Sequence, residues 1–267
     1  MKKKYVAAGL CLAAVVCLGA GIYMKVQEDS AGREYDGLKE EVLTSSSPEE
    51  TPEATAQAAA TPVVTTPEAE KAPVVIPIDF AALQQINPDA YAWIRIPGTA
   101  IDYPVLQREG DNSYYLDHTA EGTQAAEGAI FTEDYNTKTF EDVNTVIYGH
   151  DMKNGTMFQN LLKYKDRSFF DQNREVIIYL PDKILHYQIF AAYVYDDRHL
   201  MESINFDDKE IYQKYLDRIF STRDMSASID TDMEVAADDR IVTLSTCNAA
   251  DSETRYLVQA VLISIDE

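Results

Sequence analysis

The sequence predicts a mainly β domain, a barrel or sandwich with helical insertions, preceded by a segment that does not belong to it. Segments rich in Val, Ile and Tyr recur between residues 91 and 265, with turn-forming residues between them. Within this region only two segments repeat apolar residues at helical spacing. Before residue 78 the chain has an apolar run and then a stretch rich in Pro, Thr and Glu. We therefore expect one domain over residues 78–267.

The N-terminal segment predicts a membrane anchor. Three lysines at positions 2–4 precede the run Tyr5 to Met24, which contains no charged residue. A helix of about 20 apolar residues spans the roughly 30 Å of a bilayer core. Because positive charge is retained in the cytoplasm, we expect a cytoplasmic tail at 1–4, a transmembrane helix at 5–24 and an extracellular remainder. A cleaved signal peptide is the alternative, but Gly19 to Gly21 is a poor cleavage site.

Residues 25–77 predict an extracellular linker. Stretches such as 44–54 are rich in Pro, Thr, Ser and Glu, and they have little apolar surface to offset the entropy of ordering the chain. We expect a disordered spacer that holds the domain away from the membrane. Leu38, Val42 and Leu43 indicate a short helix within it.

The domain itself begins with a short helix after Asp79, which Pro88 prevents from continuing. We expect strands at residues 91–96, 101–106, 143–148, 176–180, 184–195, 240–246 and 255–265. Helices are expected at 156–163 and 207–222. The second of these has an amphipathic pattern and a capping pair in Asp207 and Glu210.

Charge and cysteine content restrict the possible functions. The chain has 23 Lys and Arg against 45 Asp and Glu, a net charge of −22, which excludes nucleic acid as a partner because a polyanion would be repelled. Cys11 and Cys17 lie in the apolar run, so Cys247 is the one thiol of the expected domain. That domain can form neither an internal disulfide nor a zinc site of the Cys-x-x-Cys type. We expect no metal and no cofactor.

Three residues could together perform thiol chemistry. Cys247 follows the strand-like run 241–246 and precedes a loop, so its side chain can face a cleft. Arg255 opens the next strand, and pairing of the two strands would bring its charge near the sulfur. His150 ends the strand-like run 144–149, and an imidazole can exchange protons with a thiol and an amine. The structural alternatives are a core cysteine, a surface ion pair and a polar loop residue. The other histidines occupy less suitable positions: His118, His186 and His199.

In combination, these segments resemble sortases, and class B sortases in particular. The matching stretches follow the family's order: 87–105, 111–116, 128–131, 144–152 and 243–247. The most specific set is Tyr148-Gly149-His150, then Leu244 to Cys247, with Arg255 downstream. The resemblance covers about residue 80 to the C-terminus.

The resemblance implies an eight-stranded sortase-type β-barrel with N-terminal helices, in which the helix near 207–222 is the class B insertion. It also implies a cysteine transpeptidase that cuts a C-terminal sorting motif of secreted proteins after Thr. Cys247 would form the thioester, His150 would act as general acid and base, and Arg255 would stabilise the oxyanion or the substrate. The acyl group would then pass to an amine of the cell wall peptidoglycan.

The resemblance further implies substrate contacts at Asn112, Leu116 and Ser245. Some class B members carry an acidic residue directly after the nucleophile, whereas this chain has Asn248. A role for such a carboxylate is therefore in doubt here. Three other functions stay open: a class B sortase that polymerises pilins through a Lys acceptor, a catalytically silent membrane-tethered binding protein, and an unrelated cysteine protease.

Overall fold

The computed structural model describes residues 32–43, 74–248 and 251–267. The predicted cytoplasmic tail and transmembrane helix, residues 1–24, lie outside the described residues, and so does most of the predicted linker. Within the described ranges, no helix has both the length and the apolar character needed to cross a bilayer.

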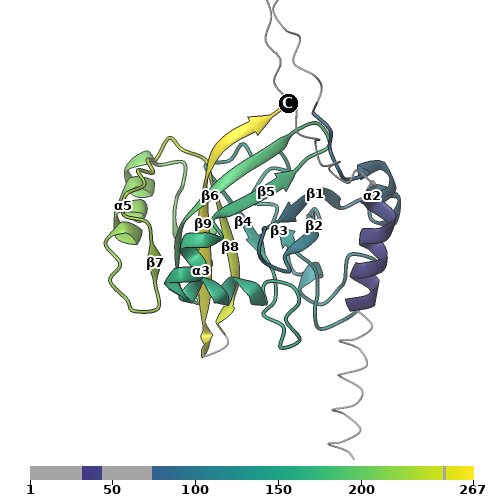
Figure 1. Ribbon diagram of the computed structural model, residues 1–267, viewed down its shortest axis with the longest axis horizontal. Coiled ribbons are helices and arrows are strands. Elements are labelled where there is room, and N and C mark those ends of the chain that lie inside the picture. The colour runs from purple at the N-terminus through teal and green to yellow at the C-terminus, as the bar shows by residue number, and fades with distance from the viewer. Residues whose placement is uncertain (1–31, 44–73, 249–250) are drawn as a thin grey trace, which may run out of the picture.

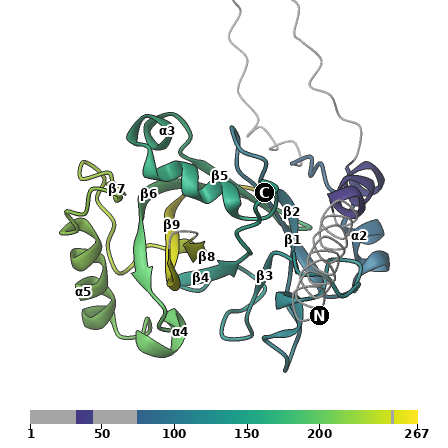
Figure 2. The same ribbon diagram turned by 90° about the horizontal axis from the view of Figure 1, so that it is seen from below.

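A single sheet forms the centre of the described part of the molecule (Figure 1). Its strands are β1 (Ala90–Arg95), β2 (Asp102–Leu106), β3 (Phe131–Thr132), β4 (Asn144–Tyr148), β5 (Glu175–Tyr179), β6 (Ile184–Asp196), β7 (Ser228–Ile229), β8 (Ile241–Asn248) and β9 (Asp251–Asp266). The strand order is β5-β1-β2-β3-β4-β8-β9-β6-β7, and β5 also pairs with β6. That extra pairing closes eight strands into a ring and leaves the two-residue β7 outside it (Figure 2). The predicted eight-stranded barrel is confirmed.

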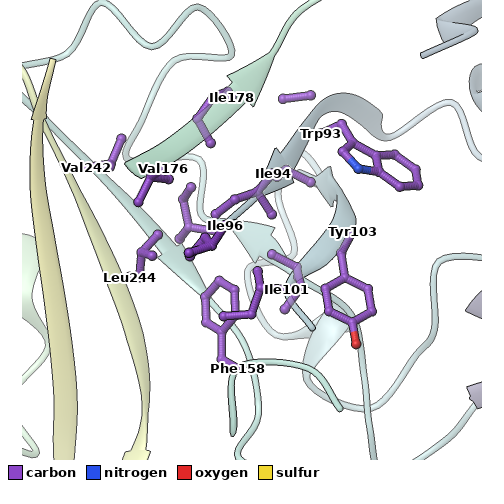
Figure 3. Close-up of a cluster of buried hydrophobic side chains, with 14 of the residues drawn as sticks. Trp93, Ile94, Ile96, Ile101, Tyr103, Phe158, Val176, Ile178, Val242 and Leu244 are labelled. Atoms are coloured by element: carbon purple, nitrogen blue, oxygen red, sulfur yellow. The ribbon is translucent and has the colours of Figure 1, made fainter. Parts of the chain in front are cut away.

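The barrel interior is filled by branched and aromatic side chains (Figure 3). Side chains alternate along a strand, so Val242 and Leu244 of β8 point into the barrel while Thr243 faces outward. They meet Ile94 of β1 and Ile178 of β5, which are paired directly across the two strands. Each side chain of this kind contributes about 1.5–3 kcal/mol on full burial. This core gives the strands that carry the site a rigid base.

The helices cover the ring from several sides. α2 (Phe80–Ile86) begins where predicted, because the Asp79 side chain accepts the Ala82 N–H, and it ends before Pro88. The remaining short helices are η1 (Tyr114–Leu116), η2 (Gln159–Lys165), α3 (Arg167–Gln172) and α4 (Leu200–Ser203). The helix expected at 156–163 is thus the 3-10 helix η2, which begins later than predicted.

α5 (Lys209–Phe220) is the helix predicted near 207–222, and it packs a second core against the outer face of β4, β6, β8 and β9. Its buried residues include Tyr212, Leu216 and Ile219. The predicted cap is wrong by one position, since the side chain of Asp208, rather than that of Asp207, accepts the backbone N–H groups of the first turn. An N-cap side chain accepts the backbone N–H of the second or third helical residue, and for Asp208 these are Glu210 and Ile211.

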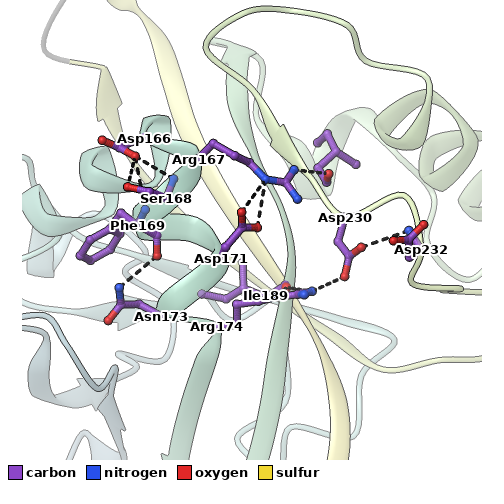
Figure 4. A network of polar contacts seen from close by, with 11 residues as sticks. Asp166, Arg167, Ser168, Phe169, Asp171, Asn173, Arg174, Ile189, Asp230 and Asp232 are labelled. Atoms are coloured by element: carbon purple, nitrogen blue, oxygen red, sulfur yellow. Dashed lines mark hydrogen bonds and ion pairs between the residues drawn. The ribbon is translucent and has the colours of Figure 1, made fainter.

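A polar network fastens α3 to the segment around β7 (Figure 4). Arg174 donates to the carbonyl of Ile189 and forms an ion pair with Asp230. Arg167 donates to the carbonyl of Ile229 at 2.8 Å. These bonds attach the segment between α5 and β8 to the barrel.

The predicted boundary of the linker at residue 77 needs correction. Residues 32–42 are helical, and this helix lies beside α2 at the edge of the barrel (purple in Figure 1). Its apolar face, Tyr35, Leu38 and Val42, is buried in the barrel core cluster, and Leu43 pairs with Ile78. The spacing i, i+3, i+7 gives a short helix one apolar face, and burial of that face makes it part of the folded domain.

Candidate active site

The register of β8 and β9 places two of the predicted residues side by side. Cys247 is paired directly with Arg255 across the antiparallel ladder. Side chains of directly opposed residues lie on the same face of a sheet, with Cβ atoms about 4.5–5.5 Å apart. The positive charge of Arg255 is one of the causes that lower the pKa of the Cys247 thiol. Strand pairing alone therefore brings the guanidinium to the sulfur.

The third predicted residue, His150, lies just after β4, which runs parallel to β8. The last residue of β4 pairs with Ser245, and the N–H of Gly149 then donates to the Ser245 carbonyl at 3.1 Å. A side chain on Gly149 would not fit, since its Cβ would lie 2.4 Å from Ile130 Cδ1 and 2.8 Å from the Phe158 ring. The Phe158 N–H donates to the His150 carbonyl at 2.9 Å. These contacts fix the backbone that presents His150.

The imidazole of His150 lies between Cys247 and a backbone carbonyl. Its Nε2 lies 2.7 Å from the Leu116 carbonyl oxygen. Because a carbonyl only accepts, Nε2 carries a proton in either charge state, and Nδ1 is left to exchange a proton with other groups. The Leu116 carbonyl thus selects the tautomer of the ring.

The two titrating groups favour opposite charges. The pKa of His150 is raised, chiefly by its hydrogen bond with Cys247 and further by the Leu116 carbonyl, although burial opposes the shift. The pKa of the Cys247 thiol is lowered, chiefly by the same hydrogen bond and further by Arg255, again against burial. Both shifts stabilise the charged forms of the pair, the thiolate and the imidazolium, relative to their isolated values. The thiolate is the nucleophilic form of cysteine.

A groove runs from the thiol along the outer side of β8. Its first part is a pocket of about 100 Å³, and a second pocket of about 210 Å³ adjoins it. Both are lined by Leu116, Phe131, Tyr148, Ser245 and Arg255; His150 and Cys247 line the first alone. An extended peptide lying in this groove would pass over the sulfur and the guanidinium.

The three residues predicted to contact substrate all line this groove, in different ways. Leu116 is 48% exposed and faces both pockets. Ser245 is largely buried in the floor. Asn112 lines the second pocket only. Its Nδ2 donates to Oδ1 of Asp134 at 2.7 Å, and its own Oδ1 accepts the backbone N–H of Asp134 at 2.9 Å. The amide of Asn112 is therefore held in place by its own loop.

Sequence reasoning missed a polar pair at the far end of the groove. The Nε2 of His199 lies 2.6 Å from the carboxylate of Glu133, and both line the second pocket. The ring of His199 also lies beside Tyr148, the last residue of β4. His199 stands in a charged stretch of the sequence, and no sequence signal links residues 133 and 199. Only the fold of the chain around α4 brings them together.

The site thus brings a thiol, an imidazole and a permanent positive charge together in one pocket. Among the described residues, no three His, Cys, Asp or Glu side chains are arranged to hold a metal ion. The arrangement is suited to attack on a carbonyl carbon, with Arg255 available to the developing oxyanion and His150 to the leaving group.

Comparisons with known proteins identify the family of this chain. A family model described as the sortase domain matches residues 94–263. Sortase B of Listeria monocytogenes is 34% identical over an alignment of 190 residues that covers 68% of this chain and 73% of that protein. Sortase B of Staphylococcus aureus is 36% identical over an alignment of 190 residues that covers 70% of this chain and 75% of that protein. The crystal structure of Clostridium perfringens sortase B superposes with a TM-score of 0.63 and 34% identity, covering 70% of this chain and 100% of that one.

Proposed function

The chain belongs to class B of the sortase family, whose members are cysteine transpeptidases, and from this membership we propose its reaction. It cleaves a C-terminal sorting motif of secreted proteins after Thr and forms a thioester. It then transfers the acyl group to an amine of the cell wall peptidoglycan. The observation that carries the proposal is the pairing of Cys247 with Arg255 in the pocket where His150 is hydrogen-bonded to the thiol.

In the first half-reaction the thiolate of Cys247 attacks the carbonyl carbon of the Thr residue. The carbonyl oxygen becomes an oxyanion, to which Arg255 donates hydrogen bonds. The C–N bond breaks as Nδ1 of the His150 imidazolium gives its proton to the departing amine. The products are a thioester on Cys247, a neutral imidazole and a released C-terminal fragment.

In the second half-reaction an incoming amine attacks the thioester carbonyl. Nδ1 of His150 takes the proton that the amine loses, and the C–S bond breaks to restore the thiolate and the imidazolium. Asn112, Leu116 and Ser245 contact the bound peptide along the groove. Their place in the lining of the two pockets supports this assignment.

We also propose that residues 5–24 anchor the enzyme as a single-pass helix, with residues 1–4 in the cytoplasm and the catalytic domain outside. The charge-free run behind three lysines supports this topology. An enzyme held in this way would meet its substrates as they leave the membrane.

Intact-mass spectrometry tests the proposal. A fragment of residues 32–267, which retains the packed N-terminal helix, is incubated with peptides that carry Thr before the cut. We expect an acyl adduct on Cys247, absent from the Cys247→Ala variant. No adduct with any peptide of the library would contradict the proposal and favour the silent binding protein.

Added amines identify the acceptor. A peptide with an N-terminal amine of the cross-bridge type and a peptide with a Lys side chain are compared at equal concentration. Faster transfer to the first supports peptidoglycan as the acceptor. Faster transfer to the Lys side chain would replace it with the pilin-polymerising alternative, and release by water alone would favour a protease.

A further inference from the structure

A buried carboxyl group near the active site has no evident partner. Glu127 is 2% exposed, and neither of its carboxylate oxygens has a hydrogen-bond partner among the described residues. Burying a carboxylate without a partner costs several kcal/mol unless an opposite charge lies near it. Such a group in a native fold calls for an explanation.

The loop that carries Glu127 packs against the segment of Leu116, whose carbonyl accepts the hydrogen bond of His150. The N–H of Ala129 donates to the Tyr115 carbonyl at 2.9 Å, and the N–H of Ala125 donates to the Asp117 carbonyl at 2.9 Å. Gly128 lies between them with a φ of 56°, and a Cβ there would be 2.8 Å from the Leu116 carbonyl oxygen. The loop therefore lies directly behind the carbonyl that binds Nε2 of His150.

A contact from the N-terminal helix restricts this loop further. The Tyr35 hydroxyl donates to the Gly128 carbonyl at 2.8 Å and accepts the Ala120 N–H at 3.3 Å. The backbone on both sides of residue 127 is thus anchored.

Negative charge on Glu127 raises the pKa of two titratable groups. The pKa of Tyr35 is raised, mainly by burial and to a smaller extent by negative charges that include Glu127. The pKa of His150 is raised chiefly by its bond with Cys247, and Glu127 adds to the shift. Of these two, only the imidazole can become positive. It is therefore the natural counter-charge of the buried carboxylate.

We propose that Glu127 is a positioning residue that holds a negative charge behind His150 and stabilises its imidazolium form through space. The inference rests on the proposed function, since the imidazolium is the form that protonates the leaving amine. Cys247 on β8 and Arg255 on β9 line the same pocket as the imidazole of His150. Asp151 directly follows His150 in the chain, and Glu127 lies in the loop behind the Leu116 carbonyl. A carboxylate in a low-dielectric surrounding acts over a longer distance than one in water.

The test compares Glu127→Gln with Glu121→Gln in the full chain. Both variants remove one negative charge from the same loop, but Glu121 is exposed and is not among the groups that shift His150. The imidazole of His150 is titrated by NMR, and kcat/KM for a sorting-motif peptide is measured as a function of pH. For Glu127→Gln we expect the His150 titration and the high-pH limb of kcat/KM to move down by about half a unit or more. Glu121→Gln should leave both unchanged.

Equal titrations in the wild type and Glu127→Gln, or equal shifts in the two variants, would overturn the inference. A lower melting temperature without a pH shift would make Glu127 merely structural and would overturn it as well. Should Glu127→Gln fail to fold, Glu127→Leu, which leaves no polar atom to bury, is titrated in its place. A wild type that forms no thioester would refute the proposed function, whereas the NMR titration still decides the role of Glu127.

Discussion

The two walls of the active-site pocket are built in different ways. The strand wall consists of Ser245, Cys247 and Arg255, which stand on the regular ladder of β8 and β9. The loop wall consists of His150, which follows β4, and Leu116, which ends η1, and separate contacts outside the strand ladder hold both. Backbone pairing fixes the first wall, whereas the second depends on packing between segments far apart in the chain. Substitutions in the strand wall should therefore change chemistry alone, and changes beneath the loop wall should affect both chemistry and stability.

The largest effect is expected from the nucleophile of the strand wall. Cys247→Ala removes the proposed nucleophilic sulfur, so turnover of a sorting-motif peptide should fall by at least about 10³-fold. The melting temperature should stay close to that of the wild type, because the neighbouring ladder bonds are made by the backbone. Kinetics and thermal unfolding on the same preparation measure both. Substantial residual turnover would place the nucleophile elsewhere.

The second prediction concerns the positive charge of that wall. Arg255→Ala should lower kcat/KM by about 10²–10³-fold, since the proposed oxyanion donor is lost. Because Arg255 lowers the pKa of the Cys247 thiol, its loss should also move the pH profile of alkylation by iodoacetamide to higher pH. Arg255→Lys retains the charge and is the control for that shift. An unchanged alkylation profile in Arg255→Ala would show that the charge does not act on the sulfur.

Gly149→Ala tests the support of the loop wall. The new Cβ would collide with Ile130 and Phe158, so His150 should be displaced from the thiol. We expect a loss of about 10–10² in kcat and a destabilisation of about 1–3 kcal/mol. Chemical denaturation and peptide cleavage are the measurements. A variant with normal activity and stability would show that the packing of Ile130 and Phe158 around Gly149 does not hold His150 in place.

The smallest effect on activity is expected from the N-terminal helix, which does not line the pocket of Cys247. Leu38→Ala leaves a cavity at a fully packed position and should lower the free energy of unfolding by about 2–4 kcal/mol. Turnover of the remaining folded protein should change little. Glu40→Ala, on the exposed side of the same helix, is the matched control. If the two variants were equally stable, the helix would not belong to the folded domain.

Several predictions from the sequence agree with the structure because they depend on local pattern. The alternation of Val, Ile and Tyr identified the long strands, and Pro88 marked the end of α2. The helix near 207–222 was found from its amphipathic spacing. The linker boundary and the Asp207 cap were wrong. Leu38, Val42 and Leu43 indicate a short helix, but a local pattern does not show that this helix packs on the barrel. A difference of one residue in a cap lies below the resolution of a sequence pattern.

The sequence by itself determined the class of chemistry. Cysteine, histidine and arginine each stand at the end or the start of a strand-like run, and local hydrophobic pattern is enough to locate such ends. The surroundings of those groups depend on the tertiary structure: the Leu116 carbonyl on His150, the Glu133–His199 pair and the buried carboxyl group of Glu127. These contacts join residues 34 or more positions apart, or depend on burial, and neither property is encoded in the pattern of neighbouring residues.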